Sequence, residues 1–163
     1  MDGAAGSILV IGFGNPSRED DGLGPAAAEI VERSGIDGVS VDIDYQLSVE
    51  HAADIAEHCI VVFIDASVDG EEPYAFEKVT PKHVESFSSH SVSPEQVLGL
   101  AGNLFNARTE GYMLGIRGYS FEMFVGDMTD GAKSNLTLAA GRLVAALRSG
   151  DIVESMGDKR EKR

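Results

Sequence analysis

The sequence predicts a single α/β domain, in which a mostly parallel, twisted sheet carries helices on both faces in three layers. Short apolar runs alternate with stretches of helical periodicity, which is the pattern of repeated strand–helix–strand units. The most apolar run, Cys59–Ile64, is typical of a central strand buried on both faces. A length of 163 residues, 43% of them hydrophobic, is enough for one packed core.

Other runs are expected to complete the sheet. Ile8–Gly12 is short, apolar and ends in glycine, which predicts the first buried strand. Tyr74–Val79 alternates between apolar and polar residues, which predicts an edge strand. Further strands are expected at Val39–Asp44 and Tyr112–Ile116.

The helices are predicted from apolar spacing and from the residues at their ends. Ser93 and Gln96 form a capping-box pattern, and Pro94 stands at the first position of the helix that follows. The other helices are expected from Pro25 to about Ser34, over Val49–Glu57, and from a cap at Thr129 or Asp130 to Gly150.

Composition narrows the class of protein. Residues 1–150 are expected to form the domain, and residues 151–163 a charged, frayed tail. A single cysteine, Cys59, excludes an intramolecular disulfide and predicts a cytoplasmic protein. Neither a signal peptide nor a membrane span is expected. The formal charge of −14 makes nucleic-acid binding unfavourable and suits a basic partner, although on charge alone acidic solubility is the favoured explanation.

Three side chains are expected to meet at one edge of the sheet. Ligand sites of open α/β sheets lie beyond the carboxyl ends of the strands. Asp21 follows the first strand, Asp65 follows the central strand, and His90 precedes the helix that begins near Ser93. Two carboxylates and an imidazole suit a divalent ion such as zinc or nickel, with positions left open for a substrate group or water.

Each of these residues also has a simpler interpretation. The loop Gly12–Ser17 invites nucleotide binding, but it lacks a third glycine and the expected helix starts too late, so a tight turn is the alternative. The acids Glu19, Asp20 and Asp21 stand before a helix, where they also stabilise its dipole. Asp65 could close a turn, and a lone loop histidine is often a surface residue.

Other chemistry is poorly supported. Cys59 begins a buried run and so lies at the wrong end of its strand for a nucleophile. The Gly-x-Ser-x-Gly pattern of a serine nucleophile is absent from the sequence.

In these residues the chain resembles the nickel–iron hydrogenase maturation proteases, over roughly Ile8–Leu147. The most specific part is ILVIGFGNPSREDDGLGP at Ile8–Pro25, which is similar to the family's opening strand, glycine–asparagine turn and acidic pair. Further segments follow in the family's order: Ile64-Asp65-Ala66, Ser88-Ser89-His90-Ser91, and Gly115-Ile116 followed by Ser120-Phe121-Glu122.

The resemblance implies a phosphorylase/hydrolase-like fold and a monomeric endopeptidase. Its task would be to remove the C-terminal extension of a hydrogenase large-subunit precursor after nickel insertion. The family's ligand positions fall on Asp21, Asp65 and His90, which are expected to contact nickel supplied by the substrate. No organic cofactor is implied. Asp21 stands where some members carry glutamate, which shortens the reach by about one bond, and Asp20 and Asn15 are expected to orient the ligands.

Other functions remain as alternatives. A non-enzymatic assembly chaperone or metal-binding module for hydrogenase would use the same residues. A peptidyl-tRNA hydrolase opens with a similar Gly-Asn-Pro turn, but its histidine is missing here and the acidic charge opposes tRNA. A nucleotide-binding regulator is a third candidate. An aspartic protease is not favoured, because a carboxylate pair sharing a proton needs no histidine.

Overall fold

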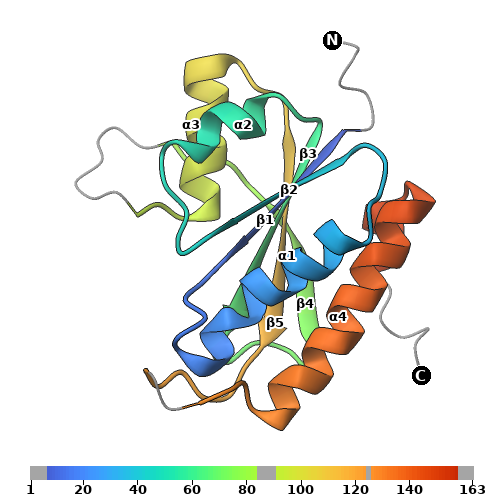
Figure 1. Ribbon diagram of the computed structural model, residues 1–163. Coiled ribbons are helices and arrows are strands. Elements are labelled where there is room, and N and C mark those ends of the chain that lie inside the picture. Colours follow the sequence, from blue (N-terminus) through green and yellow to red (C-terminus); the bar gives the residue numbers. More distant parts are fainter. Residues whose placement is uncertain (1–6, 84–90, 124–125, 158–163) are drawn as a thin grey trace.

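The computed structural model describes residues 7–83, 91–123 and 126–157, which form a twisted sheet between two layers of helices (Figure 1). Within these ranges the strands follow the order β2-β1-β3-β5-β4. Four of them run parallel, and β4 pairs antiparallel with β5 at the sheet edge. Their bounds are β1 (Ile8–Phe13), β2 (Val39–Asp44), β3 (Ile60–Ser67), β4 (Tyr74–Val79) and β5 (Glu110–Arg117).

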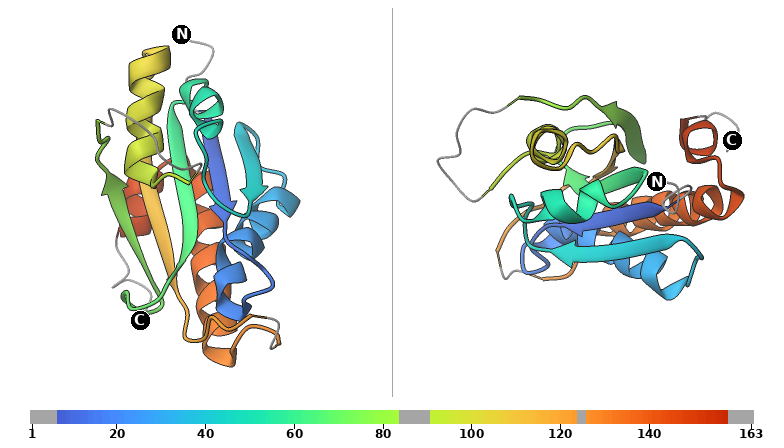
Figure 2. Two further views of the ribbon diagram at one scale, coloured as in Figure 1. Left: turned by 90° about the vertical axis from the view of Figure 1, so that its left-hand side faces the viewer. Right: turned by 90° about the horizontal axis from the view of Figure 1, so that it is seen from above.

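The helices fall on both faces of the sheet, as the sequence predicts (Figure 2). They are the short 3-10 helix η2 (Glu19–Gly22), then α1 (Leu23–Arg33), α2 (His51–Ala56), α3 (Pro94–Phe105), α4 (Asp130–Ser149) and α5 (Ile152–Gly157).

Alternate residues of the central strands supply the two halves of the core. In β1, Ile8 and Val10 pack with α1 and α4, whereas Leu9 and Ile11 pack with α2 and α3. This alternation follows from the period of two along a strand. The three-layer prediction is therefore confirmed.

The predicted central strand is central, but its bounds differ. β3 begins at Ile60 and continues through Asp65 to Ser67, because β5 keeps pairing with it up to the Ser67–Arg117 pair. Asp65 therefore lies within the strand, opposite Gly115, and does not close it. In the sequence, the acidic residue Asp65 after an apolar run indicated the end of the strand, although the pairing with β5 continues beyond it.

The predicted helix ends are confirmed in two cases and shifted in a third. The Ser93 hydroxyl accepts from Gln96 N (3.1 Å) and the Gln96 side chain accepts from Ser93 N (2.9 Å), so the capping box is formed. Thr129 caps α4 through Ala132 N (3.2 Å). However, α1 begins at Leu23, two residues before Pro25, because η2 leads directly into it. Proline is tolerated there, since the first-turn N–H groups of a helix have no intrahelical partner.

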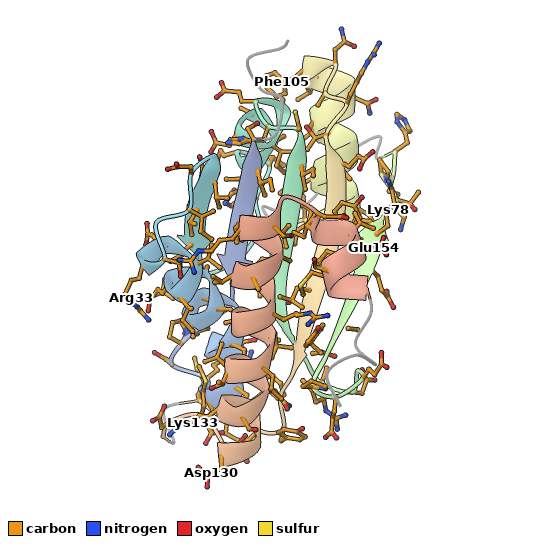
Figure 3. All side chains as sticks on the ribbon, turned by 90° about the vertical axis from the view of Figure 1, so that its right-hand side faces the viewer. Arg33, Lys78, Phe105, Asp130, Lys133 and Glu154 are labelled. Carbon is orange, nitrogen blue, oxygen red and sulfur yellow. The ribbon has the colours of Figure 1, made fainter. Side chains whose placement is uncertain are left out.

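The prediction of a frayed tail is wrong for residues 152–157. These residues form α5, in which Ile152 and Met156 are buried against the core that α4 covers. Arg142 Nε of α4 also donates to Ser155 O at 2.9 Å. Figure 3 shows α5 beside α4, with Glu154 on the short helix. The two buried side chains, spaced four residues apart, explain why a mostly polar segment is ordered.

No helix within the described ranges has the length and apolar character that crossing a membrane requires.

Candidate functional site

The carboxyl ends of the parallel strands meet at one edge of the sheet, and η2 and the start of α1 lie at this edge (Figure 1). Open α/β sheets bind their ligands here because the loops at this edge are free to carry polar side chains.

Two glycines allow α1 to begin directly on the strand ends. A Cβ atom on Gly24 would lie 2.4 Å from Phe13 O and 2.5 Å from Ile64 O. A Cβ atom on Gly12 would lie 2.4 Å from Gly24 O. Any side chain at either position would push the helix away from β1 and β3. The glycine loop is thus explained by close packing, which favours the turn interpretation over nucleotide binding.

Asp65 is the most perturbed acid of this edge. Burial raises the pKa of its carboxyl group to about 7, against an ordinary value of 3.8. A hydrogen bond from Ala66 N to Oδ1 (2.7 Å) opposes that rise, and the negative charge of Asp21 adds to it. At neutral pH a large fraction of Asp65 is therefore protonated, and a nearby cation would favour its ionised form.

Asp21 faces the same place from η2. Its Oδ2 accepts a hydrogen bond from Asn15 N at 2.7 Å, which fixes the carboxylate over the turn that follows β1. The charge of Asp21 contributes to the raised pKa of Asp65, so the two carboxylates interact electrostatically at this edge. The structure thus brings together two of the three residues that the sequence singled out. Asn15 orients Asp21 through its backbone, whereas its side-chain oxygen accepts from Ser17 N (2.9 Å).

His90 lies outside the described residues, so its predicted place at the site stays a prediction. The nearest described residue, Ser91, forms an isolated bridge with Ser48, in the segment that follows β2. Among the residues that the structure describes, no three His, Cys, Asp or Glu side chains gather closely enough to hold a metal ion. A metal site at this edge would therefore need a ligand from elsewhere, such as His90 or a substrate.

Asp20 has a different role from its neighbour. It is fully buried, and its carboxylate accepts from Tyr119 N (2.7 Å), Ser120 N (3.1 Å) and both the backbone N and the hydroxyl of Thr129 (2.8 Å each). Burial alone would raise the pKa of Asp20, but these hydrogen bonds together outweigh it and lower the pKa. Asp20 thus ties η2 to the segment after β5 and to the start of α4.

The neighbouring Glu19 strengthens this tie. Its Oε1 accepts from the Ser120 hydroxyl and from Glu122 N (3.1 Å). The residue has a positive φ of 49°, a conformation that is unusual for a side chain other than glycine, asparagine or aspartate. Sequence reasoning assigned the three acids to capping or ligand binding, and it missed these contacts because the partners lie about a hundred residues further along the chain.

A second acidic cluster was also missed. His51 is buried, and its Nε2 lies 3.6 Å from Oδ2 of both Asp42 and Asp44. Its Nδ1 accepts from Ser48 N at 3.0 Å, so in the neutral ring the proton is on Nε2, facing the carboxylates. Neither ring nitrogen then offers a free lone pair, so this cluster is not a metal site. Its contacts instead hold α2 against β2.

Fold and site together define a class: a three-layer α/β protein with paired carboxylates at the carboxyl edge of a mostly parallel sheet. No protein-family model matches the chain, and no curated protein matches it either.

Solved structures, in contrast, are similar over most of the chain. The NiFe hydrogenase maturation protease HycI from Thermococcus kodakarensis KOD1 has a TM-score of 0.68 and 22% identity, covering 88% of this chain and 92% of that one. The hydrogenase maturating endopeptidase HybD from E. coli has a TM-score of 0.63 and 22% identity, with 88% and 93% covered. An endopeptidase HycI from Escherichia coli has a TM-score of 0.64 and 21% identity, with 86% and 90% covered. The chain therefore has the fold of these proteins.

Proposed function

We propose that this protein is an endopeptidase that removes the C-terminal extension of a nickel–iron hydrogenase large-subunit precursor. Asp21, Asp65 and His90 are the residues that recognise nickel, which the substrate brings with it. The sequence resemblance and the shared fold of structures named as hydrogenase maturation proteases support this assignment from independent directions.

The single observation that carries the proposal is the state of Asp65. A carboxyl group with a pKa of about 7, beside a second carboxylate, is costly to ionise while no cation is present. A divalent ion between the two carboxylates would remove both the repulsion and the cost of ionisation. Oxygen ligands from aspartate, with an imidazole, suit a borderline ion such as nickel. Strongly perturbed titratable groups also concentrate at functional sites.

A substrate-borne ion would make cutting conditional on assembly. In a nickel-loaded precursor, Asp21 and Asp65 would supply carboxylate ligands to the metal, and Asp65 would give up its proton to do so. The peptide bond beside the metal centre is then positioned for hydrolysis, in which water adds across one amide to give a new carboxylate and a new amine. A nickel-free precursor lacks the contact that positions it. The protein acts as a monomer in the cytoplasm, with no resident organic cofactor.

The test is processing of a purified nickel-loaded precursor, followed as the mass of the large subunit. We expect Asp21→Asn, Asp65→Asn and His90→Ala to slow cutting by about 100-fold or more, since even residues that only orient metal ligands cost 10-fold to 100-fold. Glu154→Gln, an exposed acid on α5, is the control and should cut at the wild-type rate. Wild-type rates in all three site variants would overturn the site assignment.

The same assay separates the enzyme from its main alternative. A non-enzymatic chaperone would form a stable complex and leave the mass of the precursor unchanged. Nickel-free precursor should not be cut, and efficient cutting of it would contradict the recognition step while leaving the peptidase activity in place.

A further inference from the structure

A surface pocket lies beside the loop that holds the Asp21 carboxylate. Its volume is about 250 Å3, and it is lined by Gly14, Pro16, Pro25, Ile43, Asp44 and Tyr45. Pockets that take whole small molecules are typically larger, about 300–1,000 Å3. This one is suited to a single side chain.

The pocket and the candidate site are built from the same loop. Gly14 and Pro16 stand on either side of Asn15, whose backbone N holds the Asp21 carboxylate at 2.7 Å. Gly14 N also donates to Asp44 O at 3.1 Å, which joins this loop to the end of β2. A group seated in the pocket is therefore next to the segment that positions Asp21.

Apolar side chains are exposed around this edge. Ile43 and Tyr45 of the pocket are 36% and 70% exposed, although single exposed apolar residues are common and decide nothing alone. Here they are joined by others that follow the neighbouring strands: Val68 after β3, and Tyr119 and Met123 after β5, at 42–67% exposure. Apolar residues gathered around a polar site are typical of a surface that binds another protein.

The charge of the edge restricts the occupant further. Asp44 lines the pocket, its side chain is 49% exposed, and the chain as a whole carries a formal charge of −14. An acidic side chain would be repelled there, and the small apolar pocket offers it no counter-charge.

We propose that this pocket is a specificity subsite, which accepts one apolar side chain of an extended peptide and rejects an acidic one. The proposal rests on the peptidase function proposed above, and it assigns Ile43 and Tyr45 to substrate selection. The peptide belongs to the precursor, and the selected side chain lies within a few residues of the bond that is cut.

The experiment uses a series of nickel-loaded precursors, in which each residue near the cut bond is replaced in turn by leucine, serine or glutamate. For the wild-type protein we expect kcat/KM to follow the order leucine, serine, glutamate at one position, with about 10-fold to 100-fold between leucine and serine. Ile43→Trp fills the pocket and should reduce that ratio to near one, and Tyr45→Ala should reduce it severalfold.

The control is Leu138→Ser, an exposed apolar residue on α4 that should leave every ratio unchanged. Because Ile43 and Tyr45 are surface residues, the variants should fold, and an unfolding curve in urea checks this. Wild-type ratios in both pocket variants at every position would overturn the subsite while the peptidase function stands. If the wild-type protein cuts no precursor, the function fails and the subsite fails with it.

Discussion

Asp20 is fully buried and Asp65 is half-buried at the same edge of the sheet, yet their surroundings shift the pKa values of the two carboxyl groups in opposite directions. Around Asp20, three backbone N–H groups and a hydroxyl converge on the carboxylate and lower its pKa. Within β3, the Asp65 carboxylate accepts a backbone hydrogen bond from Ala66 and is affected by the negative charge of Asp21, and burial raises its pKa to about 7.

The difference separates a carboxylate that holds the fold from one that is available to a ligand. A buried charge is tolerated when hydrogen bonds replace the water it has lost. Asp20 meets that condition within the protein, so its ionised form stabilises the folded state. Asp65 does not, so it gains from a cation that arrives from outside. Removing either carboxylate tests this contrast directly.

The largest effect on stability is expected at Asp20. Asp20→Ala leaves the buried donors of Tyr119, Ser120 and Thr129 without their acceptor, so we expect the free energy of unfolding to fall by about 3 kcal/mol or more. Urea denaturation at pH 7 measures it. Asp130→Ala, an exposed acid in the first turn of α4, is the control and should cost less than about 1 kcal/mol. Equal stability of the two variants would contradict the assigned role of Asp20.

The pH dependence of stability should have opposite signs at the two residues. Because the folded protein binds the Asp65 proton more tightly than the unfolded chain does, the stabilisation from this group is full below pH 3.8 and is lost as the pH rises through about 7. Compared with wild type, Asp65→Asn should therefore gain about 2–4 kcal/mol between pH 4 and pH 8, since one pKa unit corresponds to about 1.4 kcal/mol. The lowered pKa of Asp20 acts the other way, and its contribution is lost only as the pH falls below 3.8.

Unfolding curves at a series of pH values measure both effects. A stability difference between wild type and Asp65→Asn that stays constant from pH 4 to pH 8 would show that the carboxyl of Asp65 is not perturbed as described.

A smaller effect is expected at Thr129. Its hydroxyl donates to Asp20 (2.8 Å) and caps α4 through Ala132 N (3.2 Å), so Thr129→Val should lower the free energy of unfolding by about 1–2 kcal/mol. Thr137→Val is the matched control, because the Thr137 hydroxyl makes only an exposed bond to Lys133 O. Thermal or urea unfolding distinguishes them, and a larger loss at Thr137 would contradict the capping role.

The smallest effect is expected for the electrostatic coupling between the carboxylates of Asp21 and Asp65. Asp21→Asn should lower the pKa of Asp65 toward its ordinary value but leave it raised, because burial is the larger cause. Carboxyl-carbon chemical shifts of Asp65, followed by NMR across pH, measure this. An unchanged Asp65 titration in Asp21→Asn would mean that the two groups do not share a site.

Sequence alone predicted the parts of the molecule that local chemistry decides. The apolar run at the heart of β3, the Ser93 capping box and Gly150 at the end of α4 all act on neighbouring residues, so their patterns are visible in the chain. The predicted placement of Asp21 and Asp65 at one edge, where parallel strands bring their carboxyl ends together, agrees with the effect of the Asp21 charge on the pKa of Asp65. Their role in binding nickel stays a prediction.

What the sequence could not predict depends on distant partners. Asp20 differs in role from Asp21 because it accepts hydrogen bonds from Tyr119, Ser120 and Thr129. No pattern in the neighbouring sequence predicts these partners. The order of α5 likewise depends on a core that other helices build. The prediction for His90 lies outside the described residues and awaits the processing assay.

The contact between Gly24 and the strand ends has a consequence for engineering. Because Gly24 has no side chain, the start of α1 packs directly against Phe13 O and Ile64 O. This contact sets the distance between the strand ends and the acidic turn that precedes the helix. An alanine at this position would force the start of the helix and the strand ends apart, and the turn that carries Asp21 would shift with the helix. Gly24 is therefore the position at which a substitution would change the distance between the carboxylates of Asp21 and Asp65, and with it the size of the ion that could bind between them.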